Sequence, residues 1–269
     1  MFRLPVSWTS STVLASLLGL GLLGPISSAV ASNFSVSPIQ IYLSPKADRS
    51  ASSKILSIRN DSPKPLRFQV SAFTWSQTAT SPVQLESTED VIFFPNMLSL
   101  APGESRNVRI GITADPSEQE KTYRIVVEEL PPLKTPQATN SALQVQVLTK
   151  MSIPIFIQPT QPKISGEIQA IQAQNGKIAF QVKNTGNTHF TAQQVRVKGY
   201  GSTLEKPIFD RSTAGWYILS NSTRNFDLEV PKTDCAKVKA ITIEVEYGTK
   251  QRLTQNAQTP NGLCSATSR

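Results

Sequence analysis

The chain has 269 residues, and its 27 Lys and Arg against 19 Asp and Glu give a formal net charge of +8. The basic residues are scattered along the chain, which argues against a nucleic-acid-binding protein and favours a solvated basic surface. The sequence contains no phosphate-binding loop, zinc-protease motif or nucleophile elbow. We therefore expect no catalytic residue, no cofactor and no small-molecule substrate.

The first 31 residues have the pattern of a cleaved secretion signal. Arg3 supplies a positive start, Val13–Leu23 is apolar, and Ala29–Ala31 has the small-x-small pattern of a signal peptidase site. The apolar run is shorter than the roughly 20 residues that span a bilayer, so an uncleaved anchor is the weaker alternative. We expect residues 1–31 to be a signal peptide and the mature protein to be exported.

Strand-like segments follow one another through the rest of the chain, separated by turn clusters such as Asn60–Pro63 and Ala101–Gly103. The predicted strands of the first half are Phe34–Leu43, Lys54–Asn60, Leu66–Trp75, Val91–Phe94, Ser105–Thr113, Tyr123–Leu130 and Leu143–Ile157. Those of the second half are Glu167–Ala173, Lys177–Asn184, Ala192–Val197, Thr223–Val230 and Val238–Tyr247. This pattern predicts an all-β protein of two immunoglobulin-like β-sandwich domains in tandem.

Two prolines, Pro159 and Pro162, indicate a stiff connector between the halves. We predict an N-terminal domain over residues 32–158, a linker over 159–163 and a C-terminal domain over 164–269. The only two cysteines are Cys235 and Cys264. In an exported protein they favour one disulfide, with two free buried thiols as the alternative.

The last predicted strand of the first half has an unusual pattern. Leu143, Val145 and Val147 alternate with two glutamines, so the three apolar side chains share one face. The strand then continues to Ile157, which is longer than most strands. Its pattern fits an ordinary core strand, or an edge strand whose apolar face reaches a partner.

Several motifs occur in an order that points to one family. They are Val36–Pro38, Leu98–Glu104, Tyr123–Pro131, Leu143–Val147, Ile153–Ile157, Val182–Asn187 and Gly215–Leu219. Their succession resembles the periplasmic chaperones of the chaperone–usher pilus pathway. The segments Phe73–Gln77 and Ile153–Ile157 are more similar to its archaic, spore-coat-like branch.

The resemblance implies two domains in a boomerang arrangement and a location in the periplasm. It implies a chaperone that binds and folds pilus subunits and delivers them to an outer-membrane usher. In such chaperones the seventh strand completes a subunit that lacks its own last strand. The matching residues here are Leu143, Val145, Val147 and Thr149. Self-association of the client-free protein is left open.

The carboxylate anchor of the family is altered in this chain. Many members bind the C-terminal carboxylate of the subunit with an Arg of the first strand and a Lys of the seventh. The corresponding residues here are Gln40 and Ser152, which carry no charge. A partly buried carboxylate needs a charged partner, and Arg124 and Lys150 are candidates. We hypothesise that these two share the role and that Gln40 can add a hydrogen bond; the alternative is two surface charges.

Two other functions can be compared with this one. A secreted adhesin or structural pilus component would lack its own seventh strand, which this sequence contains. A carbohydrate-active enzyme would need two converging carboxylates, whereas Glu128 and Glu129 are adjacent in a strand and point to opposite faces. The only histidine, His189, has no companions with metal-ligand spacing, so we expect a structural or surface role and no metal.

Overall fold

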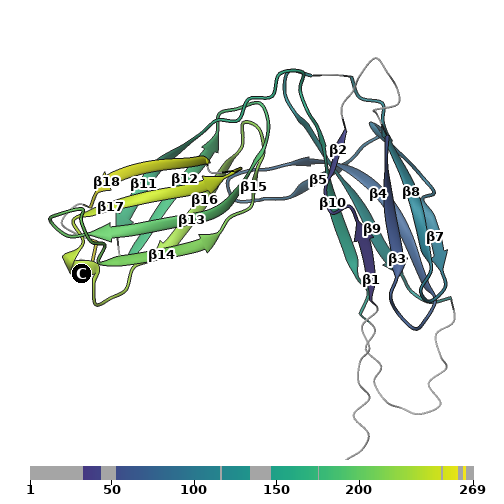
Figure 1. Ribbon diagram of the computed structural model, residues 1–269, viewed down its shortest axis with the longest axis horizontal. Helices are drawn as coiled ribbons and strands as arrows, with labels where there is room; N and C mark the ends of the chain where they lie inside the picture. Colours follow the sequence, from purple (N-terminus) through teal and green to yellow (C-terminus); the bar gives the residue numbers. More distant parts are fainter. Residues whose placement is uncertain are drawn as a thin grey trace, which may run out of the picture.

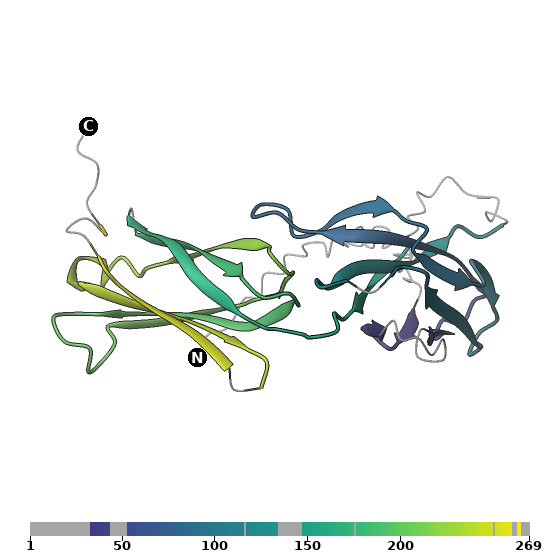
Figure 2. The same cartoon turned by 90° about the horizontal axis from the view of Figure 1, so that it is seen from above.

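The computed structural model describes residues 33–43, 53–115, 117–133, 147–174, 176–249, 251–259 and 263–264. The predicted signal peptide, Leu143 and Val145 lie outside these residues. Figures 1 and 2 show two β-sandwiches joined by a short connector and inclined to one another. The predicted fold class, with two immunoglobulin-like sandwiches in tandem, is confirmed. None of the described segments is a helix long and apolar enough to cross a membrane.

The first sandwich is formed by β1 to β10, which pack in two sheets. The strands are β1 (Phe34–Ser37), β2 (Ile41–Leu43), β3 (Ser53–Asn60), β4 (Leu66–Ser76), β5 (Gln84–Ser87), β6 (Val91–Phe94), β7 (Met97–Leu100), β8 (Ser105–Ile112), β9 (Lys121–Leu130) and β10 (Lys150–Ile157). One sheet has the order β1-β3-β8-β6 and the other β2-β10-β9-β4-β5, with β7 also paired to β4. Alternate residues such as Leu56, Ile58, Ile125 and Val127 fill the core between the sheets.

The predicted first strand, Phe34–Leu43, is wrong as a single element. The chain leaves one sheet after β1 and enters the other as β2, with a cis bond between Ser37 and Pro38. Pro38 has no N–H to donate to a ladder, which explains why the strand is interrupted there. β1 pairs antiparallel with β3, and β2 pairs parallel with β10, where Ile41 lies opposite Ile155. This change of sheet places Gln40 at the end of the first sandwich that faces the second.

The second sandwich is formed by β11 to β18. Its strands are β11 (Gly166–Gln174), β12 (Lys177–Asn184), β13 (Phe190–Tyr200), β14 (Phe209–Ala214), β15 (Tyr217–Ile218), β16 (Thr223–Glu229), β17 (Ala240–Tyr247) and β18 (Gln251–Gln258). One sheet has the order β11-β12-β16 and the other β14-β13-β17-β18, with β15 paired to β13. A separate core that includes Phe180, Val195 and Ile243 lies between them. The predicted domain limits remain predictions.

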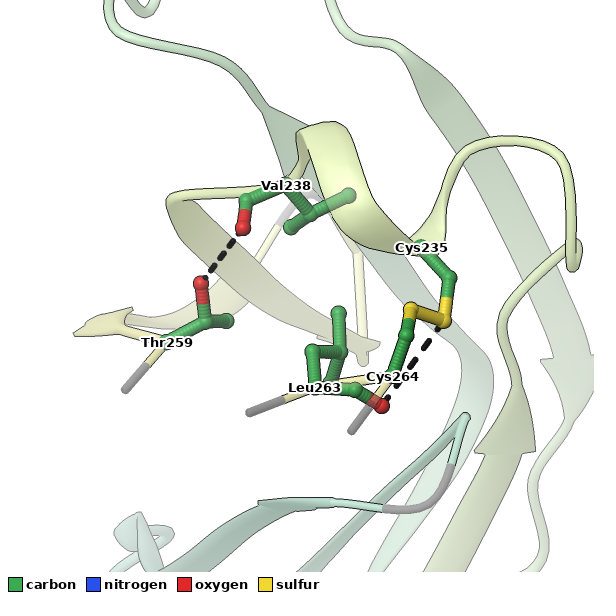
Figure 3. Close-up of a disulfide and its surroundings, with 5 residues drawn as sticks. All are labelled: Cys235, Val238, Thr259, Leu263 and Cys264. Atoms are coloured by element: carbon green, nitrogen blue, oxygen red, sulfur yellow. Dashed lines mark hydrogen bonds between the residues drawn. A yellow bond between two sulfur atoms is a disulfide. The ribbon is translucent and has the colours of Figure 1, made fainter. Parts of the chain in front are cut away.

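The predicted disulfide between Cys235 and Cys264 is present in the second sandwich (Figure 3). Cys235 begins a 3-10 turn, Cys235–Lys237, and its side chain is buried in the second core. Near the bond, the Thr259 hydroxyl donates to the Val238 carbonyl at 2.9 Å. The disulfide therefore joins the end of the chain to the turn that precedes β17.

Five strands have no counterpart in the sequence prediction: β5, β7, β14, β15 and β18. β14 and β18 are mostly polar and exposed, so they show little hydrophobic alternation. The predicted strand Leu143–Ile157 begins in the described region only at Lys150, because Val147–Thr149 lie outside any strand.

Candidate functional site

The edge of β10 is open over the first part of the strand. β10 pairs along its whole length with β9, whereas β2 lies opposite only Ile155–Ile157 on the other side. Among the described strands, none pairs with Lys150–Pro154 on that side. Within the described part of the chain, this side of Lys150–Pro154 is therefore an unpaired strand edge.

The ladder shows which backbone groups point to this edge. The Glu129 amide donates to the Thr149 carbonyl, so the backbone of Thr149 faces β9. Successive residues of an antiparallel strand alternate in direction, so Lys150 and Ser152 direct their N–H and C=O groups to the open edge. Gln158 is an even number of residues from Lys150 and Ser152, so its amide should point the same way. It donates to the Leu43 carbonyl of β2, which confirms this direction. Pro154 also faces this edge, where its missing N–H breaks no bond with β9.

Apolar side chains lie next to the open edge. Val147 is 52 % exposed and Leu148 is 42 % exposed, directly before β10 begins. Thr149 is half-buried, and its amide donates to the Glu129 carboxylate at 3.2 Å. Of the predicted subunit-binding residues, the structure therefore describes Val147 and Thr149 and places both at the start of the open edge.

Arg124 is buried at the end of the first sandwich that faces the second. It lies in β9 opposite Pro154, and its guanidinium carbon is 3.9 Å from the centre of the Trp75 ring. Nη1 donates to the Ser152 carbonyl at 3.2 Å, while Nε and Nη2 are buried without a hydrogen-bond partner in the part of the chain that the structure describes. Burial lowers the pKa of Arg124, and the nearby Tyr217 partly opposes this. A guanidinium remains charged even so.

Lys150 is not brought together with Arg124. Its register partner is Glu128, with which it forms an ion pair at 3.0 Å, and both side chains are about half exposed. Such exposed pairs contribute about 0–1 kcal/mol. Pro154, opposite Arg124, is four residues further along β10, which corresponds to about 13 Å in an extended strand.

Gln40 contacts the second sandwich. Its side-chain amide donates to the hydroxyl of Tyr217, which is in β15. The predicted role of Gln40 as a partner of the client carboxylate therefore competes with a hydrogen bond that joins the two sandwiches.

A buried aromatic cluster fills the junction between the sandwiches. Trp75, Phe156 and Leu219 form its centre, and Tyr217 packs against it. The Phe156 ring is stacked on the imidazole of His189 with their centres 3.7 Å apart. Phe156 reaches the junction because it points away from the core that holds Ile155 and Ile157.

For His189 the sequence predicts a structural or surface role. In the structure its side chain contacts Glu120. The His189 amide and ring Nδ1 both contact Glu120 Oε2, at 2.8 and 2.7 Å, and the Glu120 side chain is fully buried. Glu120 precedes β9 and His189 precedes β13, so this pair crosses the junction. No group of side chains in the described ranges could hold a metal ion.

Hydrogen bonds fix the second sandwich against the first. The Gln77 amide donates to the Tyr217 carbonyl at 3.0 Å and accepts from the Leu219 amide at 2.9 Å. The Asn187 side chain donates to the carbonyls of Glu118 and Gln161, which ties the connector to the second sandwich. The segments of Gln77 and Tyr217 both carry family motifs, but the sequence does not indicate that they meet.

Gly215 allows the Trp216–Tyr217 segment to lie close to β13. A Cβ atom at Gly215 would lie 2.2 Å from the Ala192 carbonyl oxygen, which is far inside van der Waals contact. In this position the Trp216 carbonyl accepts a hydrogen bond from the Ala192 amide at 2.9 Å. Any larger residue would displace the segment that faces Arg124.

Comparison with solved structures identifies the fold. The chain superposes on the class 5 fimbriae chaperone CfaA with a TM-score of 0.53 at 17 % identity, covering 85 % of this chain and 100 % of that one. It matches the structure of the CsuC–CsuE chaperone–tip adhesion subunit complex from archaic Csu pili of Acinetobacter baumannii with a TM-score of 0.53 at 19 % identity, covering 83 % and 97 %. The Salmonella enterica SafA pilin–SafB chaperone complex gives 0.53 at 14 % identity, covering 85 % and 98 %.

One family model matches the first half of the chain. Residues 44–163 match the family described as pili and flagellar-assembly chaperone, PapD N-terminal domain. This part of the chain is therefore similar to the N-terminal domain of the pilus-assembly chaperones, in agreement with the motifs, while the archaic branch remains a prediction. No curated protein matches the chain.

Proposed function

We propose that this protein is a periplasmic chaperone that binds and folds pilus subunits by donor-strand complementation and delivers them to an outer-membrane usher. The observation that carries the proposal is the open edge of β10 at Lys150–Pro154, preceded by the exposed Val147 and Leu148. An incomplete β-sandwich can pair its own edge with such a strand, and main-chain hydrogen bonds then supply affinity. The segment at residues 1–31 would direct export.

Apolar side chains of the donated strand would fill the open core of the subunit. Leu143, Val145 and Val147 share one face of the extended chain, which the alternation of the sequence indicates. Each aliphatic side chain that becomes fully buried contributes about 1.5–3 kcal/mol. Association costs consume part of this gain, so the complex would be stable but able to exchange.

Arg124 would bind the C-terminal carboxylate of the subunit. Its Nε and Nη2 atoms have no partner among the described residues, and its Nη1 already contacts the Ser152 carbonyl at the open edge. A guanidinium with two free donors on one side suits a carboxylate. The geometry favours Arg124 alone over the predicted pair, because Lys150 lies beside Glu128. Gln40 would hold Tyr217 in place beside the site through its hydrogen bond to the Tyr217 hydroxyl.

Co-expression with the pilus subunits encoded beside this gene tests the proposal. The wild-type chaperone should co-purify one-to-one with a subunit that is otherwise degraded, and a Leu143→Ser, Val145→Ser, Val147→Ser variant should fail to do so. A matched control replaces three exposed apolar residues elsewhere, Ile55→Ser, Ile92→Ser and Leu204→Ser. If the first variant captures as much subunit as the control, or the wild type captures none, donor-strand complementation is refuted and an adhesin or structural pilus role becomes the better account.

A further inference from the structure

Two arginines, one from each sandwich, approach the same ring at the junction. The guanidinium carbons of Arg124 in β9 and Arg224 in β16 each lie 5.6 Å from the centre of the Trp216 ring. The two guanidinium carbons can therefore be no further apart than twice this distance. Trp216 therefore holds two cations near the end of the open edge of β10.

Arg224 lacks an acceptor for part of its guanidinium. Its Nη1 atom is buried and finds no hydrogen-bond partner within the described ranges, and the guanidinium also lies 5.9 Å from the Phe226 ring. Burial lowers the pKa of Arg224. A buried donor on a charged group destabilises the protein until an acceptor reaches it. An acceptor that reaches this donor would therefore stabilise the arrangement.

The described side chains supply no anion for either guanidinium. Neither Arg124 nor Arg224 belongs to any of the ion pairs among the described residues. The buried carboxylate nearest to the junction, Glu120, is bound to His189 across it. Both cations are therefore available to an anion from outside the chain.

We propose that Arg224 is a second anion-binding residue, which takes an acidic side chain close to the C terminus of the bound subunit while Arg124 takes the terminal carboxylate. This inference rests on the proposed function. Residues two apart in an extended peptide are separated by about 6.6 Å, so a terminal carboxylate and an Asp or Glu side chain within the last three residues fit the two cations. Trp216 would set the spacing between them.

The first test is the sequence of the captured subunit. A subunit that co-purifies with the wild-type chaperone should carry Asp or Glu among its last three residues. Capture of subunits that have none would overturn the inference and leave donor-strand complementation intact. Capture of no subunit would overturn both.

The second test is a double-mutant cycle with the C-terminal twelve-residue peptide of that subunit. Arg224→Gln should weaken binding about tenfold, as expected for a hydrogen bond to a charged group. Changing the acidic residue of the peptide to its amide should have the same effect, and the two changes together should cost no more than either alone. Additive losses would overturn the inference. The exposed Arg211→Gln, in β14, is the control for loss of charge.

The same peptide with an amidated C terminus separates the two cations. Amidation should couple to Arg124→Gln and not to Arg224→Gln. Coupling of amidation to both Arg124→Gln and Arg224→Gln would show that both arginines bind one terminal carboxylate, which contradicts the assignment of a separate acidic side chain.

Discussion

The guanidinium carbon of Arg124 lies 3.9 Å from the centre of the Trp75 ring, and both side chains are buried. The ring contributes a cation–π interaction to a charge that has no acidic partner among the described residues. Two of its nitrogens also lack an acceptor in the described ranges. This charge is therefore held in place by an aromatic face, with donors left for a ligand.

Arg124→Gln is expected to weaken the complex with a subunit by roughly 10- to 100-fold, because charge-assisted hydrogen bonds contribute about 1.5–3 kcal/mol. Arg124→Lys should restore little, since a Lys cannot bind a carboxylate with two parallel donors. Titration of subunit binding measures both effects. Arg109→Gln, an exposed arginine of β8, serves as the control. Equal affinities of the Arg124 and Arg109 variants would exclude Arg124 as the anchor.

Gln77→Ala should loosen the junction without unfolding either sandwich. It removes two hydrogen bonds to the backbone of Tyr217 and Leu219, each contributing about 1 kcal/mol. Small-angle X-ray scattering should then show a broader distribution of interdomain distances. Gln69→Ala, an exposed residue of β4, the strand that precedes Gln77, should leave the scattering curve unchanged. Identical curves for the two variants would show that Gln77 does not hold the sandwiches together.

His189→Ala should destabilise the protein by about 1–3 kcal/mol, because the buried Glu120 side chain loses its contact with the imidazole and keeps only the hydrogen bond from the backbone amide of residue 189. Loss of the stacked Phe156 contact adds to the effect. The free energy of unfolding in urea provides the measurement. Adding Glu120→Gln to this variant should recover part of the loss, since the buried charge is then removed; no recovery would argue against an electrostatic origin.

Replacing both cysteines by Ala should lower the stability of the second sandwich by about 3–4 kcal/mol, the chain-entropy value for a closed loop of this length. Thermal unfolding followed separately for the two sandwiches should show a lower transition for the second. An unchanged transition would mean that packing alone holds the end of the chain.

The sandwiches could be predicted from the sequence because their core strands alternate. Val108 and Ile110 point inward while Arg109 between them is exposed, as period-two patterning requires. β18, with three glutamines and an asparagine among its eight residues, shows no such pattern, and its pairing with β17 decides its conformation. The predicted strand Phe34–Leu43 is two strands, because Pro38 has no N–H to donate to the ladder.

The junction could not be predicted, because its contacts join residues far apart in the chain. Gln40 and Tyr217 are 177 positions apart, and Gln77 and Leu219 are 142 apart. A glutamine that bonds a distant backbone has no local signature. Arg124 could be proposed from its motif, whereas its contacts with Trp75 and Trp216 required the fold.

The most direct test of donor-strand complementation is amide hydrogen exchange at the open edge of β10. The Lys150 and Ser152 amides point to this edge and should exchange rapidly in the free protein and slowly in the complex with a subunit. The Met151 and Ile153 amides face β9 and should be protected in both states. Unchanged exchange of Lys150 and Ser152 in a stable complex would show that the subunit binds elsewhere and contradict the account.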